Sequence, residues 1–76
     1  MTFENLGPKL EEPKYPDIQV KLTGKDGNAM SIIARVRQAL KRGKVSFLEQ
    51  EAFVEEATSG DYDNVLVTAM RWVDVS

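Results

Sequence analysis

Hydrophobic and polar residues alternate from Asp17 to Leu22, and the apolar residues Ile18, Val20 and Leu22 fall on one face. A period of two, with polar residues on the other face, is typical of a strand that is buried on one side. The polar run TGKDGN follows, and its two glycines suit a tight turn. The pattern therefore predicts one strand over residues 17–22 and a turn after it.

Beyond this turn the apolar residues recur every three or four positions, which is the spacing of one helix face. The three successive stripes are Ala29, Ile32, Ile33, Val36 and Leu40; Phe47, Phe53, Val54 and Ala57; and Tyr62, Val65, Leu66, Ala69, Trp72 and Val73. Gly43 ends the first helix and Ser59-Gly60 ends the second. We expect three short helices whose stripes, Phe47 and Tyr62 included, face the core.

Side chains that can accept hydrogen bonds from free backbone amides stand where each helix begins. The candidate caps are Asp26 or Asn28 for the first helix, Ser46 with Glu49 as a capping box for the second, and Asp61 or Asp63 for the third. A single strand before three helices needs a partner for its backbone groups. The candidates are Val73–Val75, the N-terminal segment and the same strand of a second subunit. We favour the C-terminal residues, which gives an α+β fold, and a homo-oligomer stays open.

Prolines mark the beginning of the chain as a separate segment. Pro8, Pro13 and Pro16 each favour extended geometry in the residue before them, so residues 1–16 are expected to form an extended N-terminal arm. Residues 17–76 then form a single small domain. The apolar runs are much shorter than the roughly 20 residues that cross a bilayer, so we expect a cytoplasmic protein with no membrane contact.

The chain contains neither histidine nor cysteine. These residues supply the commonest general base, the thiol nucleophile and the usual soft-metal ligands. Two carboxylates in SGDYDN are too few for a calcium loop. We therefore expect a non-enzymatic protein that needs no cofactor and no metal.

The charge is unevenly distributed, although the net charge is only −2. Lys21 to Lys44 contains seven basic residues and one aspartate, whereas Val45 to Ser76 contains one arginine and seven acidic residues. The basic residues of the first helix region are Arg35, Arg37, Lys41, Arg42 and Lys44. They form the candidate surface for a protein partner and, as an alternative, for the phosphates of a nucleic acid. A solvated helix face is the simpler interpretation. Leu48 and Val67 point outwards and are weaker contact candidates.

Two polar turns are the other candidate sites. Their residues are Asp26, Gly27 and Asn28 in the first turn and Gly60, Asp61, Tyr62 and Asp63 in the second. Free amides at a helix N-terminus attract anions, so a small ligand or anion could bind between the turns if they meet in space. Helix capping explains the same residues more simply.

The segments LTGKDGNAMSIIARVRQAL, EAFVEEATSGDYDNVL and RWVDV together resemble a family of small uncharacterised proteins from bacteria and their phages. The resemblance runs from Tyr15 to the end of the chain and rests on the DGNA turn, the basic RV-containing helix and the SGDYD turn. It implies a strand followed by helices and marks both turns as signature positions, but it implies no activity. From the residues we expect a protein-interaction or regulatory module, and the resemblance implies that it is of bacterial or phage origin.

Overall fold

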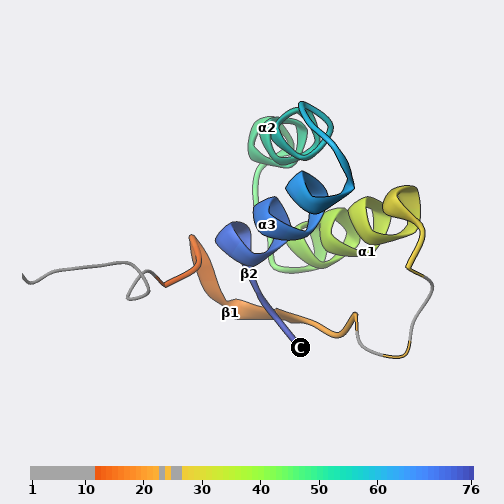
Figure 1. Cartoon of the computed structure of the whole chain (residues 1–76). Helices are drawn as coiled ribbons and strands as arrows, with labels where there is room; N and C mark the ends of the chain where they lie inside the picture. Colours follow the sequence, from red (N-terminus) through yellow and green to blue (C-terminus); the bar gives the residue numbers. More distant parts are fainter. Residues whose placement is uncertain (1–11, 23, 25–26) are drawn as a thin grey trace, which may run out of the picture.

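The computed structural model describes residues 12–22, 24 and 27–76, and its elements follow the expected order (Figure 1). They are β1 (Tyr15–Val20), α1 (Ala29–Arg42), α2 (Phe47–Ala57), α3 (Tyr62–Trp72) and β2 (Val73–Val75). The predicted α+β fold is confirmed. Residues 1–11 of the expected arm lie outside the described residues.

The two strands form a parallel sheet, so the C-terminal residues are the partner of β1, as favoured from the sequence. Tyr15 pairs with Val73 and Val20 pairs with Val75, with an irregularity between Tyr15 and Gln19. The strand begins two residues before the expected position. Pro16 is tolerated there because a strand at the edge of a sheet can lack one donor. Pairing thus satisfies backbone groups that a lone strand would leave without partners.

Three of the expected caps are present. Each accepts a hydrogen bond from one backbone N–H that has no partner within its helix. The side chain of Asn28 accepts from the N–H of Met30 at 2.8 Å, and Asp61 accepts from the N–H of Asn64 at 3.0 Å. Ser46 accepts from the N–H of Glu49 at 3.2 Å, which is half of a capping box. The Glu49 carboxylate bonds elsewhere, as described below. The alternative cap Asp26 lies outside the described residues.

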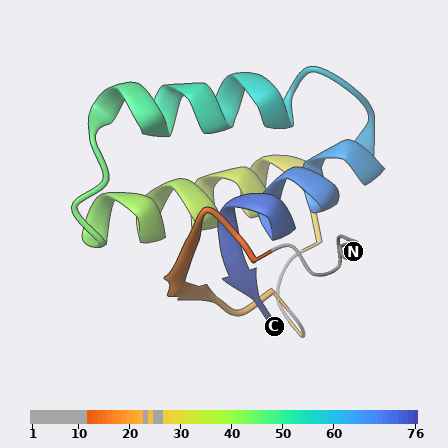
Figure 2. The same ribbon diagram turned by 90° about the vertical axis from the view of Figure 1, so that its left-hand side faces the viewer.

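The elements stack in three layers, which Figure 2 shows from the side. Helix α2 forms one outer layer, α1 and α3 lie next to each other in the middle, and the two-stranded sheet covers their opposite side (Figures 1 and 2). The core side chains come from all three layers and are Val20, Ile32, Ile33, Val36, Ala39, Leu40, Phe53, Ala57, Val65, Ala69, Trp72 and Val73. Helix α1 contacts α2, α3 and β1.

Two residues of the predicted apolar stripes are not in the core. Phe47 is 63% exposed and Tyr62 is 45% exposed, so their assignment to the core was wrong. Each is the first residue of its helix, where the neighbouring helix no longer covers the side chain. Gln50 is buried in α2 instead, and its amide donates to the backbone oxygen of Val45 at 3.0 Å. The start of α2 therefore places a polar side chain, Gln50, in the protein interior and an apolar side chain, Phe47, on the surface.

Candidate functional site

The basic residues of α1 divide into two groups rather than forming one face. Arg37 and Lys41 border a groove against α2, whereas Arg35 and Arg42 line a cavity next to β1. Lys44 follows the helix with a left-handed φ of 68° and lines neither. The division follows from helix geometry, since residues four or seven apart share a side and residues two apart do not. Each group must therefore be considered as a separate surface.

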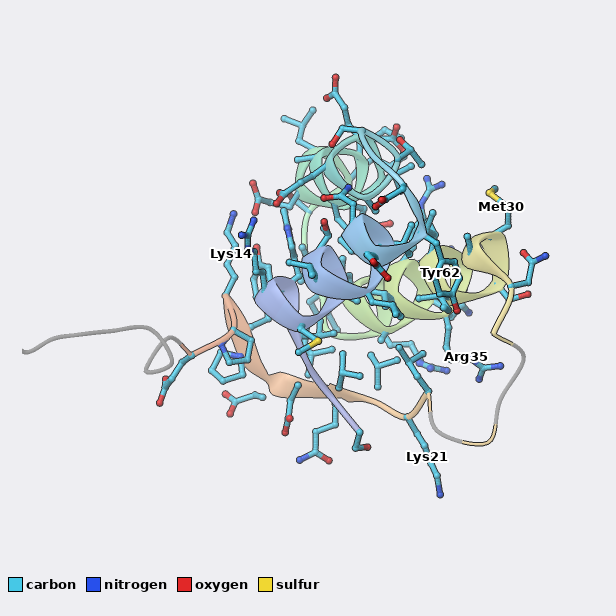
Figure 3. All side chains as sticks on the ribbon, in the orientation of Figure 1. Lys14, Lys21, Met30, Arg35 and Tyr62 are labelled. Atoms are coloured by element: carbon cyan, nitrogen blue, oxygen red, sulfur yellow. The ribbon has the colours of Figure 1, made fainter. Side chains whose placement is uncertain are left out.

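The groove between α1 and α2 has a volume of about 630 Å³. Its lining residues are Met30, Ile33, Ala34, Arg37, Gln38, Lys41, Phe47, Gln50 and Val54. Met30 is 67% exposed, and Figure 3 shows it projecting from the start of α1 on the side away from the sheet. Together with Phe47 it makes an apolar surface that the core does not use. One sign of this surface is visible in the sequence, because Met30 and Ala34 are apolar residues outside the α1 core stripe.

The groove has a basic border along α1. The Arg37 guanidinium donates to the Glu51 carboxylate across the groove at 2.8 Å and lies 5.9 Å from the centre of the Phe47 ring. Lys41 is exposed and makes no ion pair with any residue that the structure describes. A negatively charged group on a ligand would therefore meet one unpaired cation and one shared cation beside an apolar floor.

The two polar turns do meet in space. The Tyr62 hydroxyl donates to the backbone oxygen of Gly27, which ties the start of α3 to the start of α1. Asn28 and Asp61 are occupied as caps, whereas Asp63 is exposed. Gly60 leaves room for Asn64, because a Cβ there would stand 3.0 Å from the Cβ of that residue.

This contact gives most of the described turn residues a structural role. None of them lines the groove or the cavities beside α1. Asp26, the remaining signature residue, lies outside the described residues. Ligand binding between the turns therefore stays a prediction, for which the geometry supplies proximity.

A cluster at the start of β1 was not anticipated from the sequence. The Glu49 carboxylate accepts from the Lys14 ammonium at 2.7 Å and from the Tyr15 hydroxyl at 2.9 Å. The same ammonium lies 4.4 Å from the centre of the Trp72 ring, and the Tyr15 and Trp72 rings are 5.9 Å apart. The cluster fastens β1 to α2 and α3. Its residues were missed because the prolines on either side suggested an extended arm.

These contacts shift the pKa values of the three titrating groups. Hydrogen bonds from Lys14 and then Tyr15 lower the pKa of Glu49, while the bond to Glu49 raises the pKa of Lys14. Burial, followed by the bond to Glu49, raises the pKa of Tyr15. Because its pKa is lowered in the folded protein, Glu49 stabilises the fold at pH values above the ordinary pKa of a glutamate. The raised pKa values of Lys14 and Tyr15 stabilise the fold at pH values below the ordinary pKa values of these groups.

We therefore expect the urea midpoint of unfolding to be highest between about pH 5 and pH 10. It should fall as the pH drops below about 4.5 and Glu49 takes up a proton, and again as Tyr15 and Lys14 lose protons above about pH 10. Fluorescence of Trp72, the single tryptophan, measures the midpoint. Glu49→Gln should weaken the dependence on pH below 5, whereas Glu55→Gln, which alters an exposed residue, should keep it. Parallel curves for wild type and Glu49→Gln would contradict the assignment.

Within ranges 12–22 and 27–76 together with Gly24, no group of three or more acidic residues is placed to hold a metal ion. No helix in this part of the chain has the length and apolar character required to span a bilayer.

Comparison of the chain with models of protein families, with curated proteins and with solved structures finds no match. The function must therefore be argued from the surfaces themselves. The groove between α1 and α2 is the best developed of these, since it combines a large volume, exposed apolar side chains and a basic border.

Proposed function

We propose that the protein is a non-enzymatic binding module whose α1–α2 groove receives an amphipathic, acidic helix of another protein. The observation that carries the proposal is the pair of largely exposed apolar side chains, Met30 and Phe47, that face one groove. Large apolar side chains gathered beside a groove mark contact sites more often than scattered ones do. The sequence resemblance would place such a partner in bacteria or their phages.

The arrangement of the helices supports a helix as the ligand. Helices α1 and α2 run antiparallel and are joined by residues 43–46 (Figure 2). Helix α3 already packs along one side of this pair, where Phe53 lies edge-on to Trp72 with ring centres 5.7 Å apart. Phe47 and Val54 face the other side and line the groove. An amphipathic helix placed there would bury its apolar face in the way that α3 does on the opposite side.

The charges support an acidic ligand. Lys41 has no carboxylate partner among the described residues, and Arg37 shares its charge with Glu51 alone. Carboxylates that flank the apolar face of an incoming helix would approach both cations. Such rim charges mainly increase the rate of association and the specificity, while the apolar contacts supply most of the affinity.

The test is a selection of displayed helical peptides against the intact protein. Selected peptides should combine apolar residues at a spacing of three and four with an excess of Asp and Glu. Phe47→Ala should weaken their binding by about 1–2 kcal/mol, which is roughly 5- to 30-fold in Kd. Titration calorimetry with a synthetic copy of the best peptide measures the change.

Leu48→Ala is the matched control, because Leu48 is the next residue of α2, is 79% exposed and does not line the groove. This variant should bind within about twofold of wild type, since surface substitutions away from a contact have small effects. Peptides that bind Phe47→Ala as well as wild type would reject the groove. Binding that survives Lys41→Glu undiminished would reject the acidic character of the ligand.

A further inference from the structure

Two buried side-chain atoms have no hydrogen-bond partner within the part of the chain that the structure describes: Nε of Arg35 and Oγ1 of Thr68. Buried polar atoms are almost always paired, so each exception needs an explanation. Thr68 is fully buried inside the helical core and does not line the cavities described above. Arg35 lines two cavities, one between α1 and β1 and one on α1 alone.

These cavities adjoin each other and share two arginines. The smaller has a volume of about 230 Å³ and the larger about 470 Å³, and Arg35 and Arg42 line both. The other polar residues that line them are Gln19 and Lys21 in the smaller cavity and Ser31 and Gln38 in the larger. Every one of these side chains can donate a hydrogen bond, and no carboxylate lines either cavity. In Figure 3, Arg35 and Lys21 both lie on the sheet side of α1.

The positive charges of this surface are not neutralised by the described part of the protein. Arg35, Arg42 and Lys21 form no ion pair there, although the chain as a whole carries more acidic than basic residues. Arg35 and Arg42 are seven residues apart on one side of α1, a separation of about 10 Å along the helix axis that two long side chains can bridge. An anion between them would remove the repulsion of the two guanidinium groups.

We propose that Arg35, Arg42 and Lys21 bind a phosphate group on the sheet side of α1. Guanidinium groups match the geometry of phosphate, since Nε and one terminal nitrogen can donate to two of its oxygens at once. Bound in this way, the phosphate supplies the acceptor that Nε of Arg35 lacks. The phosphate belongs to a free ester or to a nucleic-acid backbone. Arg35, Arg42 and Lys21 do not line the α1–α2 groove, although Ala34 and Gln38 line both the groove and the larger cavity.

The first experiment is a titration of the intact protein with inorganic phosphate, followed by nuclear magnetic resonance of the arginine Nε–H groups. The resonance of Arg35 should shift with saturation. Arg35→Lys keeps the charge but loses the planar fork, and should weaken binding about tenfold or more. Lys44→Gln removes one charge from an exposed residue that lines neither cavity, and should change the affinity less than about twofold.

The order of these two variants decides the proposal. If binding depends on the geometry of the guanidinium group, Arg35→Lys should bind phosphate more weakly than Lys44→Gln. If it depends only on positive charge, Lys44→Gln should bind phosphate more weakly. The latter order, or no shift of the Arg35 resonance up to tens of millimolar phosphate, would overturn the proposal. Circular dichroism of each variant confirms that the helices are retained.

A labelled single strand of about 12 nucleotides, measured by fluorescence anisotropy, distinguishes the two sources of the phosphate. Binding far tighter than that of inorganic phosphate, lost steeply with added salt and weakened by Arg35→Lys, identifies a nucleic-acid backbone. Binding no tighter than that of inorganic phosphate identifies a free phosphate ester. Tight binding that Arg35→Lys leaves unchanged would place the nucleic acid elsewhere and count against the site.

Discussion

Phe53→Ala is expected to lower the free energy of unfolding by about 3–5 kcal/mol, which removes most or all of the stability of a small domain. Phe53 is fully buried, and its ring meets the Trp72 ring edge-on at 5.7 Å between centres. Its removal leaves a cavity between α2 and α3 that the surrounding helices can fill only in part. Urea unfolding followed by far-ultraviolet circular dichroism measures the loss, because the fluorescence of Trp72 itself will change.

Phe47→Ala is the matched control, since it makes the same substitution in the same helix at a residue that is 63% exposed. It should change the free energy of unfolding by less than about 0.5–1 kcal/mol. The two variants should therefore separate folding from binding. Phe53→Ala should remove most or all of the stability, whereas Phe47→Ala should weaken peptide binding by a protein that stays folded. Equal destabilisation by both would mean that Phe47 belongs to the core and that the groove is not free to bind.

The helices and their caps could be predicted because the signals for them are local. Asn28, Ser46 and Asp61 each stand immediately before an apolar stripe, and each caps the helix that follows. The pairing of β1 with the C-terminal residues could be favoured for a different reason. A single strand must satisfy its backbone groups, and Val73–Val75 offered a nearby partner. Both predictions depend on hydrogen bonds that the backbone must make somewhere.

The exposed sides of the helices could not be predicted in the same way. Periodicity gives the angle of a residue around its own helix but not the distance to which the neighbouring helix extends. Phe47 and Tyr62 have the angle of core residues and are exposed because each is the first residue of its helix. Likewise, five basic residues near one helix suggested one surface. These residues divide into two groups because α2 and β1 pack on different sides of α1, which the sequence pattern does not predict.

The cluster around Glu49 illustrates contacts that depend on tertiary structure. Glu49 was predicted to complete a capping box, which would need its carboxylate to turn back towards Ser46. The carboxylate instead bonds Lys14 and Tyr15, which are more than thirty residues away in sequence. A charged partner from another element displaces a weaker local bond, because a hydrogen bond between charged groups is the stronger of the two. No local sequence pattern at Glu49 or Lys14 predicts this ion pair.

Strand β2 is only three residues long and follows α3 without a loop, so its register depends on the burial of individual side chains. Val73 is 1% exposed and pairs with Tyr15, whereas the next residue, Asp74, is exposed and pairs with Gln19. Successive residues of a strand point to opposite faces of a sheet, so a shift by one residue would exchange their environments. Introducing the same polar residue at the two positions in turn therefore tests the register directly.

Val73→Asn should lower the free energy of unfolding by about 3–5 kcal/mol, because a buried apolar side chain is lost and an amide is placed where it has no partner. Asp74→Asn, with its side chain in solvent, should stay within about 0.5 kcal/mol of wild type. Urea midpoints measured by Trp72 fluorescence compare the two, since Trp72 is the residue that precedes β2. Equal effects of the two variants, or a larger effect of Asp74→Asn, would contradict the parallel register. The cavity that Gln19, Val20 and Lys21 help to line would then need a different arrangement of β1.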